Sequence, residues 1–107
     1  MTQARVVLIT APNVESAGNI AKTLVEEKLA ACVNIVPGIR SIYLWEGKIC
    51  DDSEVLMIAK TTAERFPDLQ KRVQGLHSYE TPEIISLPIE EGSAKYLRWI
   101  IEEVDQS

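Results

Sequence analysis

The side chains that could do chemistry gather in one segment, His77-Ser78-Tyr79-Glu80-Thr81-Pro82, which Glu83 follows. His77 is the only histidine of the chain, and an imidazole beside the carboxylates of Glu80 and Glu83 could bind a divalent cation. Tight copper or zinc sites usually need about three or four convergent ligands. The segment therefore predicts weak metal binding, unless several copies of the chain bring their side chains together. The alternative is a loop histidine whose ring nitrogens are satisfied by hydrogen bonds.

A catalytic function would have to use His77, Tyr79 and Glu83 as acid and base groups, in a cleft walled by Tyr43 and Trp45. No nucleophile motif, phosphate loop or cofactor fingerprint accompanies these residues. We therefore expect that the protein is not an enzyme. Tyr43, Trp45 and Tyr79 are instead expected to line a subunit interface or a cleft, where large aromatic side chains are common.

The two cysteines, Cys32 and Cys50, are the remaining soft-metal ligands. If Glu46-Gly47 forms a hairpin turn, Tyr43 pairs with Cys50, and Cys32 lies about eleven residues further along, roughly 36 Å away at about 3.3 Å per residue. A disulfide needs Cα atoms within about 7 Å of each other. We therefore expect neither a disulfide nor a shared metal, and we expect Cys32 to pack in the core.

The charge pattern excludes several classes of partner. The formal net charge is -5 and no Lys/Arg cluster occurs, so nucleic acid is not an expected partner. Acidic groups at Asp51-Asp52, Glu54 and Glu90-Glu91 lack the ligand spacing of a calcium loop and are expected to be solvated. No apolar stretch is long enough to span a membrane and no export signal is recognised, so the protein is expected in the cytoplasm.

The hydrophobic pattern predicts the elements that would position these residues. A buried strand is expected at 6–9, a helix capped by Asn13 comes next, and a strand at 31–36 resumes at 39–45 after a bend at Pro37-Gly38. A partner strand then runs over 48–60. A capping box, Thr61-x-x-Glu64, predicts the next helix. A buried strand at 83–89 and a helix capped by Ser93 complete the order, and the last helix is expected to turn four apolar residues inward: Leu97, Ile100, Ile101 and Val104.

The long hairpin carries apolar residues on both of its faces. Ile42, Tyr43, Leu44 and Trp45 are consecutive, and successive strand residues point to opposite sides. A chain of 107 residues cannot cover both sides of such a ribbon by itself. We therefore expect other copies of the chain to cover it.

The predicted order is βαββαβ with one added C-terminal helix, in a single domain over residues 1–107. This order is typical of an α+β, ferredoxin-like sandwich, in which two helices cover one face of a four-stranded antiparallel sheet. The other face would then need cover, which again favours oligomerisation.

Four segments in this order resemble the CutA divalent-cation tolerance family over nearly the whole chain. They are Thr10-Ala11-Pro12-Asn13, Leu29-Ala30-Ala31-Cys32-Val33-Asn34, Ser41-Ile42-Tyr43-Leu44-Trp45-Glu46-Gly47-Lys48 and His77-Ser78-Tyr79-Glu80-Thr81-Pro82-Glu83-Ile84. The resemblance implies a tight homotrimer of ferredoxin-like subunits whose long hairpins reach across to their neighbours. It also implies a link to divalent-cation tolerance and binding of copper(II) or another divalent metal.

The resemblance carries only part of the family's proposed metal site onto this chain. The first-strand position that holds a cysteine in some relatives is Ile9 here, and an adjacent pair of histidines is replaced by Leu76 and His77. Ser78 stands where a proline is usual. Only His77, with Glu80 or Glu83 nearby, carries over as a possible ligand set, which implies weak binding.

A second interpretation is a signalling trimer that binds a small molecule, by analogy with nitrogen-regulatory proteins of similar fold. Such a protein would need a basic cleft to grip phosphate groups. The candidates are Arg5, Arg40, Lys60 and Arg72, which do not cluster in the sequence. The sequence names no partner protein of another kind.

Overall fold

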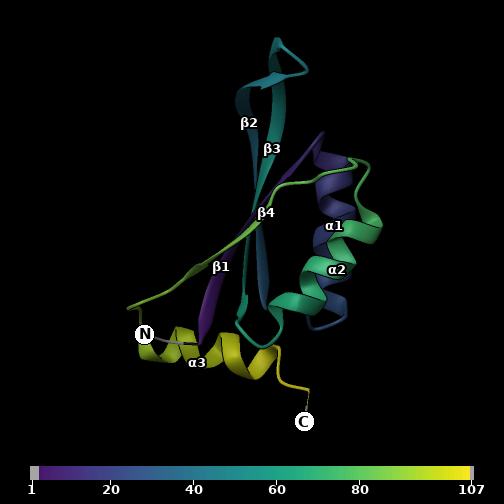
Figure 1. Cartoon of the computed structure of the whole chain (residues 1–107). Helices are drawn as coiled ribbons and strands as arrows, with labels where there is room; N and C mark the ends of the chain where they lie inside the picture. Colours follow the sequence, from purple (N-terminus) through teal and green to yellow (C-terminus); the bar gives the residue numbers. More distant parts are fainter. Residues whose placement is uncertain (1–2, 107) are drawn as a thin grey trace.

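The computed structural model describes residues 3–106, and within them it places four strands and three helices. Their order is β1 (Ala4–Ala11), α1 (Val14–Glu26), β2 (Cys32–Trp45), β3 (Lys48–Thr62), α2 (Phe66–Leu76), β4 (Ile84–Pro88) and α3 (Ala94–Glu103) (Figure 1). The strands form one sheet in the order β2-β3-β1-β4, and each neighbouring pair is antiparallel. The predicted α+β fold with an added C-terminal helix is confirmed.

The β2–β3 hairpin is the longest feature of the molecule, and its outer end projects beyond the remaining elements (Figure 1). Trp45 pairs with Lys48, as predicted. Glu46 and Gly47 both have positive φ, of 49° and 78°, which a two-residue type I′ turn requires. Gly38, at φ 79°, lies in the register shift between Val36 and Ile39, so the predicted irregularity is confirmed.

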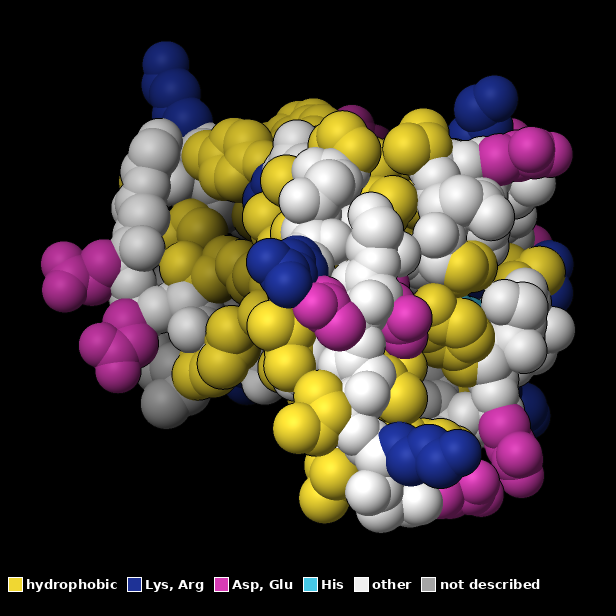
Figure 2. All heavy atoms as spheres, turned by 90° about the horizontal axis from the view of Figure 1, so that it is seen from above, with side chains coloured by type: hydrophobic (Ala, Val, Ile, Leu, Met, Phe, Trp, Pro, Cys, Tyr) yellow, Lys and Arg dark blue, Asp and Glu magenta, His cyan; other side chains and the backbone are white. Residues whose placement is uncertain are grey.

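The outer half of the hairpin exposes its apolar side chains, as expected for a ribbon that one chain cannot cover. Leu44 and Ile49 are 69% and 78% exposed, and Trp45 is also exposed. Figure 2, which views the molecule from the hairpin end, shows broad hydrophobic areas interrupted by charged side chains. A free single chain would therefore present a large apolar surface to water.

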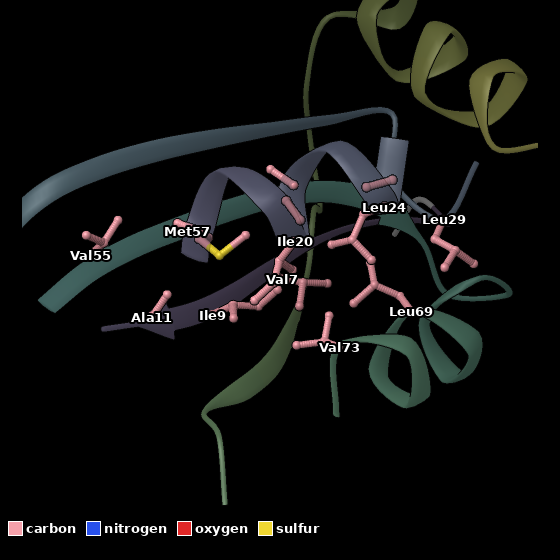
Figure 3. Close-up of a cluster of buried hydrophobic side chains, with 14 residues drawn as sticks. Val7, Ile9, Ala11, Ile20, Leu24, Leu29, Val55, Met57, Leu69 and Val73 are labelled. Carbon is pink, nitrogen blue, oxygen red and sulfur yellow. The ribbon is translucent and has the colours of Figure 1, made fainter. Parts of the chain in front are cut away.

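The core lies between the sheet and the two helices α1 and α2 (Figure 3). Alternate residues of β1 and β3 face the helices, because strand side chains alternate between the two sides of a sheet. Fully buried examples are Val7 and Ile9 on β1 and Met57 on β3. Asn13 caps α1 as predicted, since its side-chain oxygen accepts a hydrogen bond from the Ser16 N–H at 2.7 Å.

The opposite face of the sheet is only partly covered. It carries the other residues of β1 and β3, among them Leu8 and Ile58, which are half-buried. Ile85 and Leu87 of β4 lie beside β1 on this face and are each 48% exposed. The expectation of a fully buried strand at 83–89 is therefore wrong for the single chain, because β4 is an edge strand with cover on one face only.

Two local expectations at the helix ends are wrong. The capping box fails because the residue before α2 is Arg65, which makes no side-chain cap hydrogen bond. Thr61 still belongs to β3, and its hydroxyl donates to the Leu29 carbonyl at 2.6 Å. Ser93 does cap α3, and Ile100 and Val104 at its end are buried. Ile101 is 39% exposed, so the expectation that it faces inward is wrong. The face of α3 that contacts β1 and β3 does not include it. Among the described residues, no helix has the length and apolar character to cross a membrane.

Candidate functional site

His77 begins the segment that joins α2 to β4, and its side chain is only 9% exposed. Its Nε2 lies 2.7 Å from the carbonyl oxygen of Thr10. A carbonyl oxygen only accepts hydrogen bonds, so Nε2 carries the proton and donates it. Nδ1 then accepts a hydrogen bond from the Tyr79 N–H at 3.0 Å. Both ring nitrogens are therefore engaged with the backbone.

The positions related to the family's metal site do not form a compact ligand set within one chain. Ile9 is fully buried in the core, and Leu76 ends α2 with its side chain exposed. Among residues 3–106, no group of three or more His, Cys, Asp or Glu side chains could hold a metal ion. A metal on His77 would have to displace the Tyr79 N–H from Nδ1. A tight site within one chain thus does not fit these residues.

A cavity of about 420 Å³ lies between the hairpin and the segment that follows α2. We call it the hairpin cleft. Its lining residues are Thr10, Tyr43, Trp45, Glu54, Tyr79, Glu80, Thr81 and Glu83. It brings together the three aromatic residues and the two glutamates that the sequence singled out, whereas His77 is not part of the lining.

Three residues of the cleft were not among the predicted site residues: Thr10, Glu54 and Thr81. Glu54 was expected to be a solvated strand residue. It pairs with Ile39 across the hairpin, and its carboxylate accepts a hydrogen bond from the Tyr79 hydroxyl at 2.7 Å. The hairpin register predicts where Glu54 lies on its strand. Nothing in the sequence indicates its contact with Tyr79, 25 residues further along the chain.

The two tyrosines of the cleft are held by carboxylates. Burial, with the neighbouring Glu54, raises the pKa of Tyr79 to about 12. The Tyr43 hydroxyl donates to Asp52 at 2.5 Å, and this hydrogen bond shifts the pKa of Tyr43 strongly upward. Both phenols therefore stay protonated at neutral pH. The Tyr79 ring also lies against His77, with 4.7 Å between ring centroids.

The cleft is negatively charged. Glu54, Glu80 and Glu83 line it, and the lining contains no lysine or arginine. None of the ion pairs among residues 3–106 involves these three glutamates. Such a cavity favours cations over anions and neutral molecules.

The cysteines lie at different ends of the hairpin, and both thiols are free. Cys50 pairs with Tyr43 as predicted, whereas Cys32 pairs with Lys60. Cys32 is half-exposed, so the prediction that it packs in the core is wrong. Its neighbour Lys60 is on the sheet face that α1 and α2 leave open, and Cys32 shares that face.

The four basic residues proposed for phosphate binding do not gather in one cleft. Arg40 pairs with Asp51 on the hairpin, while Arg72 of α2 pairs with Glu27 after α1. Lys60 hydrogen-bonds the Asn34 side chain on the sheet, and Arg5 lies on β1. The described residues therefore do not form the basic cleft that a small-molecule-binding signalling trimer would need to grip phosphate groups.

Comparisons with known proteins agree on one family. The family model described as "CutA1 divalent ion tolerance protein" matches residues 5–103. A divalent-cation tolerance protein CutA from Thermus thermophilus is 58% identical over 97 residues, which cover 91% of this chain and 94% of that protein. A chloroplastic CutA protein of Arabidopsis thaliana is 53% identical over 89% of this chain, which spans 52% of the plant protein.

Solved structures give the same result for the fold. A structure from Archaeoglobus fulgidus, described as a periplasmic divalent cation tolerance protein CutA, superimposes with a TM-score of 0.93 at 49% identity. That alignment covers 95% of this chain and 99% of the other. Similarity therefore extends over sequence and structure alike.

Proposed function

The chain belongs to the CutA1 divalent ion tolerance family, and on that premise we propose that it acts in divalent-cation tolerance as a non-enzymatic homotrimer. Each trimer binds copper(II) or another divalent cation weakly, at clefts formed where the hairpins meet neighbouring subunits. A cytoplasmic location stays a prediction, since the relatives include a chloroplastic protein and one described as periplasmic.

The observation that carries metal binding is the set of carboxylates in the hairpin cleft. Glu80 and Glu83 come from the segment after α2, and Glu54 comes from β3. Carboxylate oxygens without a lysine or arginine partner attract divalent cations. The His77 ring contacts the Tyr79 ring, and it adds a nitrogen ligand when Nδ1 is released from the Tyr79 N–H. Weak binding follows, because that hydrogen bond must be broken and the carboxylates are spread over two elements.

Two apolar surfaces support the assembly. One is the open sheet face with Ile85 and Leu87, and the other is the outer hairpin with Leu44 and Ile49. Burial of such surfaces between identical copies stabilises an oligomer by about 25 cal/mol per Å² of apolar area. The strand order β2-β3-β1-β4 is the order that we expect for a ferredoxin-like subunit, whose open sheet face is free for such contacts.

Calorimetric titration of metal-free protein with copper(II) and with zinc tests the metal proposal. We expect weak, saturable binding by the wild type, and a loss of about tenfold or more in affinity for the double variant Glu80→Gln/Glu83→Gln. The matched control is Glu90→Gln/Glu91→Gln, which removes the same charge from exposed residues outside the cleft. Equal binding by both double variants would remove the cleft from the function proposed here.

A further inference from the structure

We propose that the hairpin cleft also binds a small organic cation, an amine or guanidinium compound, between its aromatic rings and its carboxylates. This ligand class differs from the metal ion proposed above, and its binding does not depend on metal. The two ligands would compete, because they share Glu80 and Glu83.

The size and walls of the cleft suit an organic molecule better than a bare ion. Its volume of about 420 Å³ lies within the range of about 300–1,000 Å³ that small-molecule sites occupy. Tyr43 and Trp45 form part of the wall on the hairpin, and Tyr79 adds a third ring from the segment after α2. Aromatic rings contribute little to a hydrated metal ion, whereas an alkyl chain packs against them and its charged head gains cation–π attraction.

Two of the three aromatic walls, the tyrosines, are held in place before any ligand arrives. Tyr79 is fixed through its hydroxyl to Glu54 at 2.7 Å, through its N–H to His77 at 3.0 Å, and through ring contact with His77. Tyr43 is fixed through its hydroxyl to Asp52 at 2.5 Å. Side chains that are held in place lose little conformational entropy when a ligand binds.

The charge of the cleft selects for a cation. Three carboxylates line it, and no basic side chain of residues 3–106 forms an ion pair with any of them. Thr81 adds a hydroxyl that accepts a hydrogen bond from an N–H donor. A guanidinium group offers several N–H donors in one plane and is the charged group that carboxylates and aromatic faces hold together most readily.

Calorimetric titration of the full chain in the presence of EDTA, with butylguanidinium as the probe, tests this proposal. Butylurea has the same shape without the charge and serves as the matched ligand. We expect saturable binding of butylguanidinium and a binding constant for butylurea that is weaker by about tenfold or more.

Variants locate the site. Trp45→Leu and Glu80→Gln should each weaken butylguanidinium binding by about fivefold or more, through loss of a ring and of a charge respectively. The controls are Trp99→Leu, an exposed aromatic of α3, and Glu90→Gln, which should change it by less than about twofold. Far-UV circular dichroism establishes that each variant is folded, and Glu80→Gln carries the test alone if Trp45→Leu is not.

Three results would overturn the proposal: no saturable binding up to about 10 mM, equal binding of butylurea, or wild-type affinity in Glu80→Gln. Copper binding without butylguanidinium binding supports the metal site and rejects this one. Butylguanidinium binding without any metal binding does the reverse.

Discussion

The Nε2 atom of His77 lies 2.7 Å from the carbonyl oxygen of Thr10, and this hydrogen bond joins the end of α2 to the end of β1. Nδ1 of the same ring accepts the Tyr79 N–H. The only histidine of the chain therefore shapes the segment that carries the glutamates of the hairpin cleft. Whatever binds in the cleft depends on this ring for the position of Tyr79.

Replacement of His77 by alanine should lower the free energy of unfolding by about 1–3 kcal/mol, because it leaves the Thr10 carbonyl and the Tyr79 N–H without their partner. Urea unfolding at one fixed protein concentration measures the change. Ser78→Ala, at the exposed neighbouring residue, is the matched control and should change stability by less than about 0.5 kcal/mol. If the two variants are equally stable, the imidazole does not hold this segment.

Tyr79 should ionise well above its ordinary value of 10.0, with a pKa of about 12. Because the folded-state pKa is raised, the stabilisation from this group is fully present below about pH 10 and is lost as the pH rises toward 12. Ultraviolet titration of tyrosinate absorbance measures the ionisation, and Tyr79→Phe identifies its contribution.

The variant Glu54→Gln separates burial from the Glu54 carboxylate as causes of the raised pKa of Tyr79. It removes the negative charge beside the phenol but leaves the burial, which is the larger cause. The pKa of Tyr79 should therefore fall part of the way toward 10.0. No change in this variant would show that the hydrogen bond from the Tyr79 hydroxyl to Glu54 is not formed in solution.

Ile9, at the position where the family resemblance implies a cysteine in some relatives, tests the packing of β1 in the core. The side chain is fully buried beside Met57 in the core. Ile9→Ala should lower the free energy of unfolding by about 2–5 kcal/mol, through lost burial and the cavity left behind. Val14→Ala, at an exposed residue of α1, should cost less than about 0.5 kcal/mol. A small effect of Ile9→Ala in the same unfolding assay would contradict the placement of this residue in the core.

The outer hairpin should be required for assembly. Ile49→Asp places a charge on the most exposed large apolar side chain of the hairpin, where burial of an unpaired carboxylate is costly. Sedimentation velocity should show smaller particles than the wild type forms. Lys22→Asp, on the exposed surface of α1, should leave the particle size unchanged. An unchanged sedimentation coefficient for Ile49→Asp would place the subunit contact elsewhere.

Most of the fold could be predicted from local patterns, because strand alternation, helix caps and tight turns act over a few residues. The Glu46-Gly47 turn set the register of the outer hairpin as far as Ile39, including the pair Tyr43 and Cys50, and the register shifts only beyond the irregularity between Val36 and Ile39. Predictions failed where a distant contact decided the outcome. Thr61 resembles a helix cap, yet its hydroxyl bonds to Leu29, 32 residues earlier in the chain.

The candidate site was harder to predict than the fold. The sequence favoured Tyr79, Glu80 and Glu83 because they stand close together, but it could not show that Glu54 of β3 joins them. It also could not decide between a metal ligand and a hydrogen-bonded ring for His77, because the acceptor on Thr10 is 67 residues away. Contacts of this range depend on how the sheet places its strands.

The mass of the wild-type particle in solution is the most direct test of the central claim, which is that the open sheet face and the outer hairpin are buried between copies of this chain. Sedimentation equilibrium at micromolar concentration should give about three times the chain mass of 11.9 kDa. A folded, stable and soluble particle of 11.9 kDa under the same conditions would contradict the assembly and the clefts proposed between its subunits.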